Sequence, residues 1–325
     1  MPLRSKIRYS FLRIFRGSDL SRRRLPYMAV TAEKPGPVVW LTACAHGDEV
    51  GGMVVVQEVF RAVASAPLLC GEMHAFPLMN PFGFEMGARH VAISQEDLNR
   101  AFPGRDDGAL AERIAEKIFS TIVATVPRLV IDLHNDWTRS IPYVVLDAYF
   151  EDAAGGAAGE ATRRNFDASL AFARRLSLPV VIETETSHRS LSGSLLRAGV
   201  PAVTLELGES NIVNERMVDQ GVKSVLNVLR SLEMLGDVSP GPPANLPSAP
   251  LRYSHTPFAS SSGILRFLVR PGDVVRPRQA VAKVFNVFGR LQETLHADAH
   301  AVVLGHSDSA VAYPGAEVLA FGVMG

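Results

Sequence analysis

A histidine and a glutamate three residues apart, His46 and Glu49, follow an apolar and β-branched run at 38–42. A helical spacing of apolar residues begins at Val50. The pair is therefore predicted where a strand ends and a helix begins, at the sheet edge where α/β proteins bind ligands. An imidazole and a carboxylate are two of the three protein ligands of a catalytic zinc. The alternative is an ordinary helix N-terminus with acidic residues near the positive end of its dipole.

A second histidine extends this predicted metal site. Asp132 and His134 close an apolar run at 128–134 that we interpret as a buried strand. Residues two apart in a strand face the same side, so both side chains are expected beside His46 and Glu49. His134 would supply the third ligand, and Asp132 is placed to hold the ring N–H of a ligand histidine.

The segment 79–108 is long and rich in glycine, asparagine and arginine. A connection of this length inside a compact domain is usually functional or disordered. Within it, Asn99 and Arg100 can bind a carboxylate, because the arginine fork is bidentate and the amide adds a donor. Arg89 is a second cation, which near a metal would stabilise the oxyanion formed when water attacks an acyl carbon. The alternative for 97–100 is a surface turn.

A glutamate, Glu206, closes the predicted apolar strand 201–207. A carboxylate in an apolar strand is costly to bury unless it is paired or used. At the same sheet edge it could take a proton from a water held by zinc. Glu183 and Glu185 compete for this role and rank lower, because the residues around 184–188 are typical of a loop at the rim.

Strands and helices alternate between residues 38 and 235, which predicts an α/β fold with a mainly parallel sheet and helices on both faces. The predicted strands are 38–45, 71–78, 128–134, 143–147, 179–183 and 201–207. The predicted helices are 49–64, 109–125, 166–176 and 214–235.

Composition shifts divide the chain into four segments. Residues 1–25 form a basic leader, with eight Lys and Arg against one acid in 1–24. We interpret it as a solvated segment that packs on the surface rather than as an arm for nucleic acid or lipid. Residues 26–235 form the catalytic domain. The proline-rich segment 236–251 is a linker, and 252–325, with short β-branched runs between Gly and Pro turns, form a small all-β barrel or sandwich.

The overall composition limits the classes of binding partner that we expect. The 325 residues are 47% apolar, and 33 Lys and Arg balance 33 Asp and Glu. A balanced chain has no global reason to bind nucleic acid or an anionic membrane, and no apolar run reaches membrane-spanning length. Two cysteines form no disulfide framework, which fits the reducing cytoplasm. We expect a cytoplasmic protein with a small-molecule partner, and the sequence is compatible with a homo-oligomer.

The order of these motifs resembles the succinylglutamate desuccinylase/aspartoacylase family, a deacylase branch of the zinc-carboxypeptidase fold. The resemblance covers roughly residues 38–210, and the C-terminal β segment also fits the layout of the family. It implies a carboxypeptidase-like sheet and one zinc ion per chain. The implied roles are zinc binding by His46, Glu49 and His134, substrate-carboxylate binding by Asn99 and Arg100, carbonyl polarisation by Arg89, and general-base catalysis by Glu206.

Two departures from the family pattern concern the substrate. Aspartoacylases carry a further substrate arginine before the catalytic strand, and Arg197 is near that position but out of register, so the acyl group is left undetermined. They also place a tyrosine of the C-terminal domain over the substrate, and Tyr313 lies in a comparable turn.

We therefore expect a zinc-dependent hydrolase that cleaves the amide bond of an N-acyl amino acid or a similar small carboxylate. One alternative is a zinc carboxypeptidase that acts on peptides. Another is a non-catalytic binding protein, because residues 272–280 resemble half of a biotinyl or lipoyl carrier domain. Lys283, the one lysine of residues 252–325, lacks the flanking methionines of a modified lysine.

Overall fold

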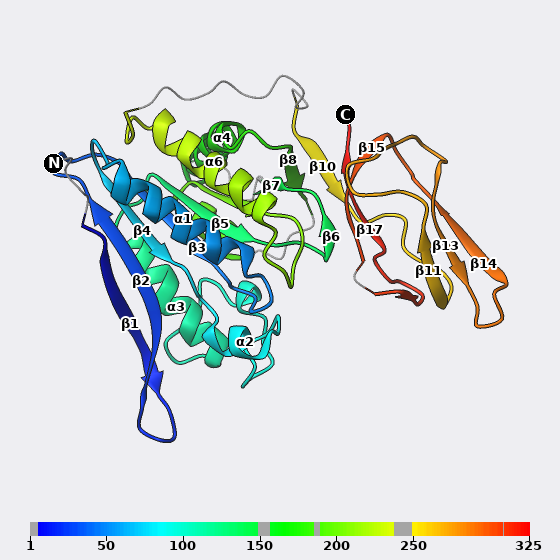
Figure 1. Ribbon diagram of the computed structural model, residues 1–325, viewed down its shortest axis with the longest axis horizontal. Helices are drawn as coiled ribbons and strands as arrows, with labels where there is room; N and C mark the ends of the chain where they lie inside the picture. The colour runs from blue at the N-terminus through cyan, green and yellow to red at the C-terminus, as the bar shows by residue number, and fades with distance from the viewer. Residues whose placement is uncertain (1–5, 149–156, 185–188, 237–248, 308) are drawn as a thin grey trace.

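In a computed structural model (Figure 1), the protein is described over residues 6–148, 157–184, 189–236, 249–307 and 309–325. Within these residues, thirteen strands form one large sheet, in the order β1-β2-β4-β3-β5-β9-β7-β8-β10-β17-β15-β12, with β6 paired to β15. The first nine in chain order are β1 (Arg8–Arg16), β2 (Arg22–Thr31), β3 (Val38–Ala43), β4 (Glu72–Phe76), β5 (Leu129–His134), β6 (Arg139–Ser140), β7 (Tyr143–Asp147), β8 (Val180–Glu183) and β9 (Ala202–Glu206). The others are β10 (Leu251–Ser254), β12 (Val274–Val275), β15 (Ala301–His306) and β17 (Leu319–Val323).

The prediction of a mainly parallel sheet is wrong, because the sheet is mixed. Strands β4, β3, β5 and β9 pair in parallel, and so do β7, β8 and β10. However, β7 runs antiparallel to β9, and antiparallel pairs also join β1 to β2, β2 to β4, and β17 to both β10 and β15. Hydrophobic periodicity gives the length of a buried strand but not its direction, so these pairings could not be predicted from it.

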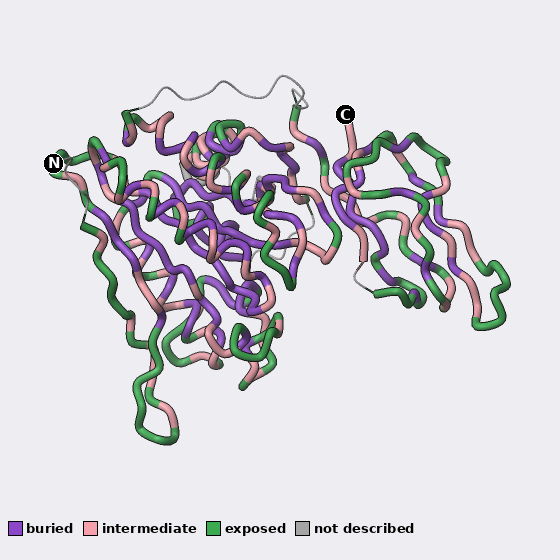
Figure 2. The backbone as a smooth tube through the Cα atoms, in the orientation of Figure 1, coloured by how far each residue is buried: buried purple, intermediate pink, exposed green. Residues whose placement is uncertain are grey.

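Helices cover both faces of the sheet, as predicted. On one face, α1 (Gly51–Ser65), α4 (Ala157–Arg175) and α6 (Glu215–Ser231) pack their apolar sides over the strands, with Val55, Phe172 and Val225 in one buried cluster. On the other face, α3 (Leu110–Val123) and α5 (Leu191–Arg197) belong to a second cluster. The buried backbone in Figure 2 therefore follows the central strands of the body. None of the helices in the described ranges is long and apolar enough to cross a membrane.

The C-terminal part contains the expected small β domain. A four-stranded sheet, in the order β14-β13-β11-β16, is formed by β11 (Gly263–Phe267), β13 (Ala280–Phe285), β14 (Leu291–His296) and β16 (Val311–Ala312). It packs through its own apolar cluster, which includes Val281 and Phe321, against strands of the large sheet. At the right of Figure 1, β10, β17 and β15 extend the large sheet next to β8, so the two halves of the chain share one sheet.

The basic N-terminal segment forms a hairpin in its described part. Strand β1 pairs with β2 from Arg8↔Ala29 to Arg16↔Arg22, and β2 pairs with β4. The hairpin projects from the body at the lower left of Figure 1, and its backbone is largely exposed in Figure 2. The division into leader, catalytic domain, linker and β domain stays a prediction, and residues 237–248 of the proposed linker lie outside the described residues.

Candidate active site

The turn between β3 and α1 carries His46 and Glu49 against a neighbouring loop. Gly47 donates its N–H to the carbonyl of Ala88 at 3.0 Å. A Cβ atom on Gly47 would lie 1.9 Å from the carbonyl carbon of Gly83, within α2 (Pro81–Met86). Only glycine allows this turn to approach α2 so closely. The close packing fixes the position of the adjacent imidazole.

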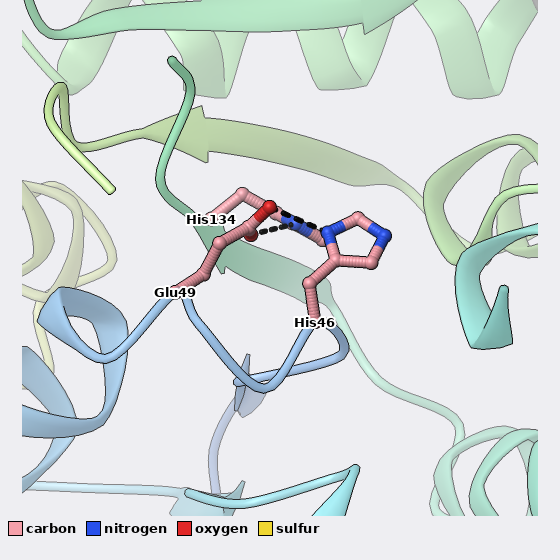
Figure 3. A group of neighbouring side chains, drawn as sticks. All are labelled: His46, Glu49 and His134. Atoms are coloured by element: carbon pink, nitrogen blue, oxygen red, sulfur yellow. Dashed lines mark hydrogen bonds and ion pairs between the residues drawn. The ribbon is translucent and has the colours of Figure 1, made fainter. Parts of the chain in front are cut away.

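His46, Glu49 and His134 form one compact buried cluster. Nδ1 of His46 lies 2.5 Å from Oε1 of Glu49, and Nδ1 of His134 lies 2.7 Å from Oε2. Three ligand atoms from these residues lie within 4.8 Å of one another. Figure 3 shows both rings directed at the same carboxylate. Two imidazoles and one carboxylate are the donor set of a catalytic zinc with an open position, so the three residues fit this metal.

Each histidine also contacts a second carboxylate through its other ring nitrogen. Nε2 of His134 lies 3.0 Å from Asp132, which also accepts a hydrogen bond from the hydroxyl of Thr42 at 2.7 Å. Nε2 of His46 lies 3.1 Å from Oδ1 of Asp97. Such contacts orient the rings and raise their basicity as ligands. The position of Asp132 agrees with the prediction, whereas the contact between Asp97 and His46 was missed.

Opposite charges in the cluster shift the pKa values of Glu49 and His134. Burial would raise the pKa of Glu49, but His46 and His134 outweigh it and hold that pKa well below its usual range. Burial would lower the pKa of His134, but Asp132 and Glu49 raise it well above its usual value. The surrounding carboxylates therefore stabilise positive charge at this point in the protein.

Arg89 lies next to the cluster. Its Nε and Nη2 donate to Oδ2 of Asp97 at 3.2 and 3.0 Å, and its Nη1 lies 3.6 Å from Oε1 of Glu49. Asp97 thus contacts both His46 and Arg89, which sets the distance between them. The guanidinium is partly exposed and lines the same cavity as the histidines.

Asn99 and Arg100 belong to a short 3-10 helix, η1 (Leu98–Arg100), whose first turn is capped by the side chain of Asp97. Asn99 is buried, and its Oδ1 accepts the backbone N–H of Leu191 at 2.9 Å. Arg100 donates from Nη1 to the carbonyl of Asn99 at 3.0 Å and lines the cavity. The pair is therefore held in place and available to a ligand.

Glu206 closes β9 beside the cluster. Its Oε2 is buried and has no hydrogen-bond partner among the residues that the structure describes. Burial raises the pKa of Glu206 well above its usual value, against the opposing effect of His134. A buried oxygen without a partner is costly, which is typical of a group that a substrate or water must meet. Its competitor Glu183 also lines the cavity, and Glu185 lies outside the described residues.

A single cavity of about 490 Å³ collects these groups. Tyr313 does not line it and is 62% exposed, so the structure does not bring it to the other predicted residues. The C-terminal half supplies Tyr253, His255 and Glu317 instead. The predicted residues brought together are His46, Glu49, Arg89, Asn99, Arg100, His134 and Glu206.

The sequence also gave no indication of a second polar wall in this cavity. Strand β7 runs antiparallel to β9 with Tyr143 beside Glu206, and its alternate residues Tyr143, Val145 and Asp147 face one side and line the cavity. Ser190 and Ser192, at the start of α5, line the same side. A strand-end aspartate at 147 was visible in the sequence, but its use depended on a strand direction that was not.

The sequence is similar to those of known proteins. Residues 35–232 match the succinylglutamate desuccinylase/aspartoacylase catalytic domain. The chain is 26% identical over 297 residues to N-alpha-acetyl-L-2,4-diaminobutyric acid deacetylase from Halomonas elongata, covering 86% of this chain and 80% of that protein.

Solved structures show the same fold. The product-bound structure of the ectoine utilization protein EutE (DoeB) from Ruegeria pomeroyi superposes with a TM-score of 0.82 at 21% identity, covering 100% of this chain and 97% of that one. A metallo-carboxypeptidase from Burkholderia cenocepacia is more distant, with a TM-score of 0.51 at 18% identity over 68% of this chain and 63% of that one. The fold is thus a mixed, carboxypeptidase-like α/β fold, and the chain belongs to the succinylglutamate desuccinylase/aspartoacylase family.

Proposed function

We propose that this protein is a zinc-dependent hydrolase that removes the acyl group from an N-acyl amino acid. The observation that carries the proposal is the buried Oε2 of Glu206, which has no partner within the described ranges and lies beside the cluster of His46, Glu49 and His134. The name of the Halomonas relative, an Nα-acetyl diaminobutyrate deacetylase, supports an N-acyl amino acid as the substrate class.

One zinc ion per chain would be held by Nδ1 of His46, the carboxylate of Glu49 and Nδ1 of His134. When bound, the ion would polarise a water molecule and the substrate carbonyl. These two histidine nitrogens already face the carboxylate, while their other ring nitrogens contact Asp97 and Asp132. These contacts support a metal site at the three residues, because carboxylates commonly orient metal-binding histidines through the second ring nitrogen.

The remaining residues of the site have separate roles in the proposed reaction. Asn99 and Arg100 bind the carboxylate of the substrate and fix its position. Glu206 takes a proton from water as the water oxygen attacks the amide carbon. Arg89 stabilises the negative charge that develops on the carbonyl oxygen. Glu206 then returns the proton to the leaving nitrogen, so the carbon–nitrogen bond breaks with release of a free amine and an acid.

The cavity favours a small substrate over a peptide. Its volume of about 490 Å³ is in the range of small-molecule sites.

Both cysteines are free, in keeping with a reaction in the reducing cytoplasm, which remains our proposed compartment.

The test is an activity screen of the zinc-loaded protein against acetyl-, succinyl- and formyl-amino acids, with release of the free amine as the measurement. A carboxypeptidase substrate is offered in competition. We expect turnover of at least one N-acyl amino acid, and a turnover about 10²- to 10⁴-fold slower by Glu206→Gln. Faster turnover of the peptide, or no amine from any N-acyl amino acid, would contradict the proposal.

A further inference from the structure

Two carboxylates on neighbouring strands, Asp147 and Glu183, line the same cavity as the cluster of His46, Glu49 and His134. Asp147 in β7 and Glu183 in β8 are register partners in parallel strands. Side chains of such partners project from the same face of a sheet, and both residues line the cavity. Two like charges placed together repel unless a cation lies near them.

Asp147 is half-buried, and neutral serine hydroxyls donate hydrogen bonds to its carboxylate. Oδ1 accepts the hydroxyl of Ser190 at 3.2 Å, and Oδ2 accepts the hydroxyl of Ser192 at 2.6 Å. The positive charge of Arg197 acts on Asp147 and opposes the effect of burial on its pKa. Burial raises the pKa of Asp147. A carboxylate in this state can still accept hydrogen bonds from a positively charged ligand.

The same short segment connects Asp147 to the proposed carboxylate-binding pair. Ser190 and Ser192 bind Asp147, and the backbone N–H of Leu191 between them binds Oδ1 of Asn99 at 2.9 Å. Asn99, which we propose binds a carboxylate, and Asp147, which could bind a cation, are therefore both hydrogen-bonded to residues 190–192. This spacing suits one small ligand that carries both charges.

Strand β9 connects this wall to the proposed base. The hydroxyl of Thr204 donates to Ser192 at 3.1 Å, and Glu206 lies two residues further along the same face. The buried Oε2 of Glu206 has no partner in the described part of the chain, which is an independent sign that this cavity receives a ligand. The wall from Glu206 to Asp147 thus presents carboxylates and hydroxyls, and an acidic substrate side chain would be repelled there.

We propose, on the basis of the proposed function, that the preferred substrate is an N-acyl amino acid whose side chain carries an ammonium group. Asp147 accepts hydrogen bonds from that ammonium, and Glu183 adds negative charge beside it. Asp147 is thus a residue that determines specificity and takes no part in the chemical step. The amino acid in the name of the Halomonas relative, diaminobutyrate, has such a second amine.

The experiment compares substrates that differ only in this charge. The zinc-loaded protein is assayed with the Nα-acetyl derivatives of L-2,4-diaminobutyrate, L-2-aminobutyrate and L-aspartate. We expect kcat/KM to favour the cationic substrate over the neutral one by about 10- to 100-fold, the usual effect of a hydrogen bond between charged groups. The aspartate derivative should be the poorest of the three.

Asp147→Asn tests the residue itself. Asparagine keeps the shape and can still accept a serine hydroxyl, but it has no charge. We expect the variant to lose the preference, with kcat/KM for the cationic substrate falling about 10- to 100-fold and that for the neutral substrate changing by less than about threefold. Asp219→Asn, at an exposed carboxylate of α6, is the matched control and should leave both values unchanged.

Calorimetric binding of free L-2,4-diaminobutyrate and L-2-aminobutyrate gives a readout that does not depend on turnover. Equal binding and equal kcat/KM of cationic and neutral compounds in the parent protein would overturn the ammonium site, even if Asp147→Asn did not fold. An equal loss on all substrates in the variant would make Asp147 structural and also overturn it. No hydrolysis of any derivative, with tight and selective binding of diaminobutyrate, would instead contradict the proposed function alone.

Discussion

His134 and Glu206 are register partners, the last residues of the neighbouring parallel strands β5 and β9. Their side chains therefore emerge together at one sheet edge, with a proposed metal ligand beside a proposed base. The backbone ladder, rather than a flexible loop, fixes the distance between them. Such a rigid placement suits a group that must meet a water molecule in a fixed position.

Glu206→Gln tests the base. Glutamine keeps the size of the side chain and an acceptor oxygen but cannot take a proton. Because general-base catalysis contributes about 10²- to 10⁴-fold, we expect kcat to fall by that factor while KM and zinc content change little. Steady-state kinetics and elemental analysis measure this, with Glu215→Gln on the exposed start of α6 as control. If Glu206→Gln stays active and Glu183→Gln or Glu185→Gln is inactive, the base has been misassigned.

His46→Ala and His134→Ala test the metal site. We expect about one zinc ion per parent chain, and loss of most of it in either variant, because each removes one of three protein ligands. Metal content after dialysis is the measurement. His296→Ala, at an exposed histidine of β14, should keep the parental content. Full zinc in both ligand variants would show that the metal binds elsewhere.

Arg100→Ala should raise KM sharply for a substrate with a free carboxylate, because the fork that holds the carboxylate is removed. Arg100→Lys should recover little, since an ammonium is a point charge without the bidentate geometry. Arg105→Ala, in the same loop and paired with Glu112, serves as the control. An unchanged KM in Arg100→Ala would exclude a carboxylate-binding role.

Asp97→Asn tests a residue that touches no substrate in our proposal. It contacts Nε2 of His46 and the Nε and Nη2 donors of Arg89, so the loss of its charge should weaken the positioning of both side chains. We expect zinc affinity to fall about 10- to 100-fold, the usual cost of losing such a contact. Competition with a chelator of known affinity gives the value. Asp106→Asn, at an exposed pair with Lys117, should have no effect, and parental affinity in Asp97→Asn would refute the role.

The predicted metal ligands could be found from the sequence because their chemistry is local. His46, Glu49 and His134 stand directly after apolar runs, and the ends of buried strands can be identified from such runs. Asp97 was recognised only as a neighbour of Asn99 and Arg100, because its contact with His46 spans 51 positions. Asp147 was missed for a similar reason, since its place in the cavity depends on the direction of β7.

The structure brings a different C-terminal tyrosine to the cavity from the one expected from the sequence. Tyr313 stands in an exposed turn, whereas Tyr253 reaches the cavity because β10 pairs with β8. That pairing joins residues about 70 positions apart, through Leu251↔Val181 and Arg252↔Ile182. No local propensity encodes such a partner. The boundaries of the strands could therefore be predicted better than their neighbours.

The junction between β8 and β10 also has a consequence for cooperativity. Because the hydrogen-bond ladder continues from one half of the chain into the other, local opening of β10 would expose the edge of β8 and the wall that carries Glu183. The two halves should then unfold as one unit. In native-state hydrogen exchange, the amides of β8, β10 and β17 would share one opening free energy, and a ligand in the cavity would slow all three strands together.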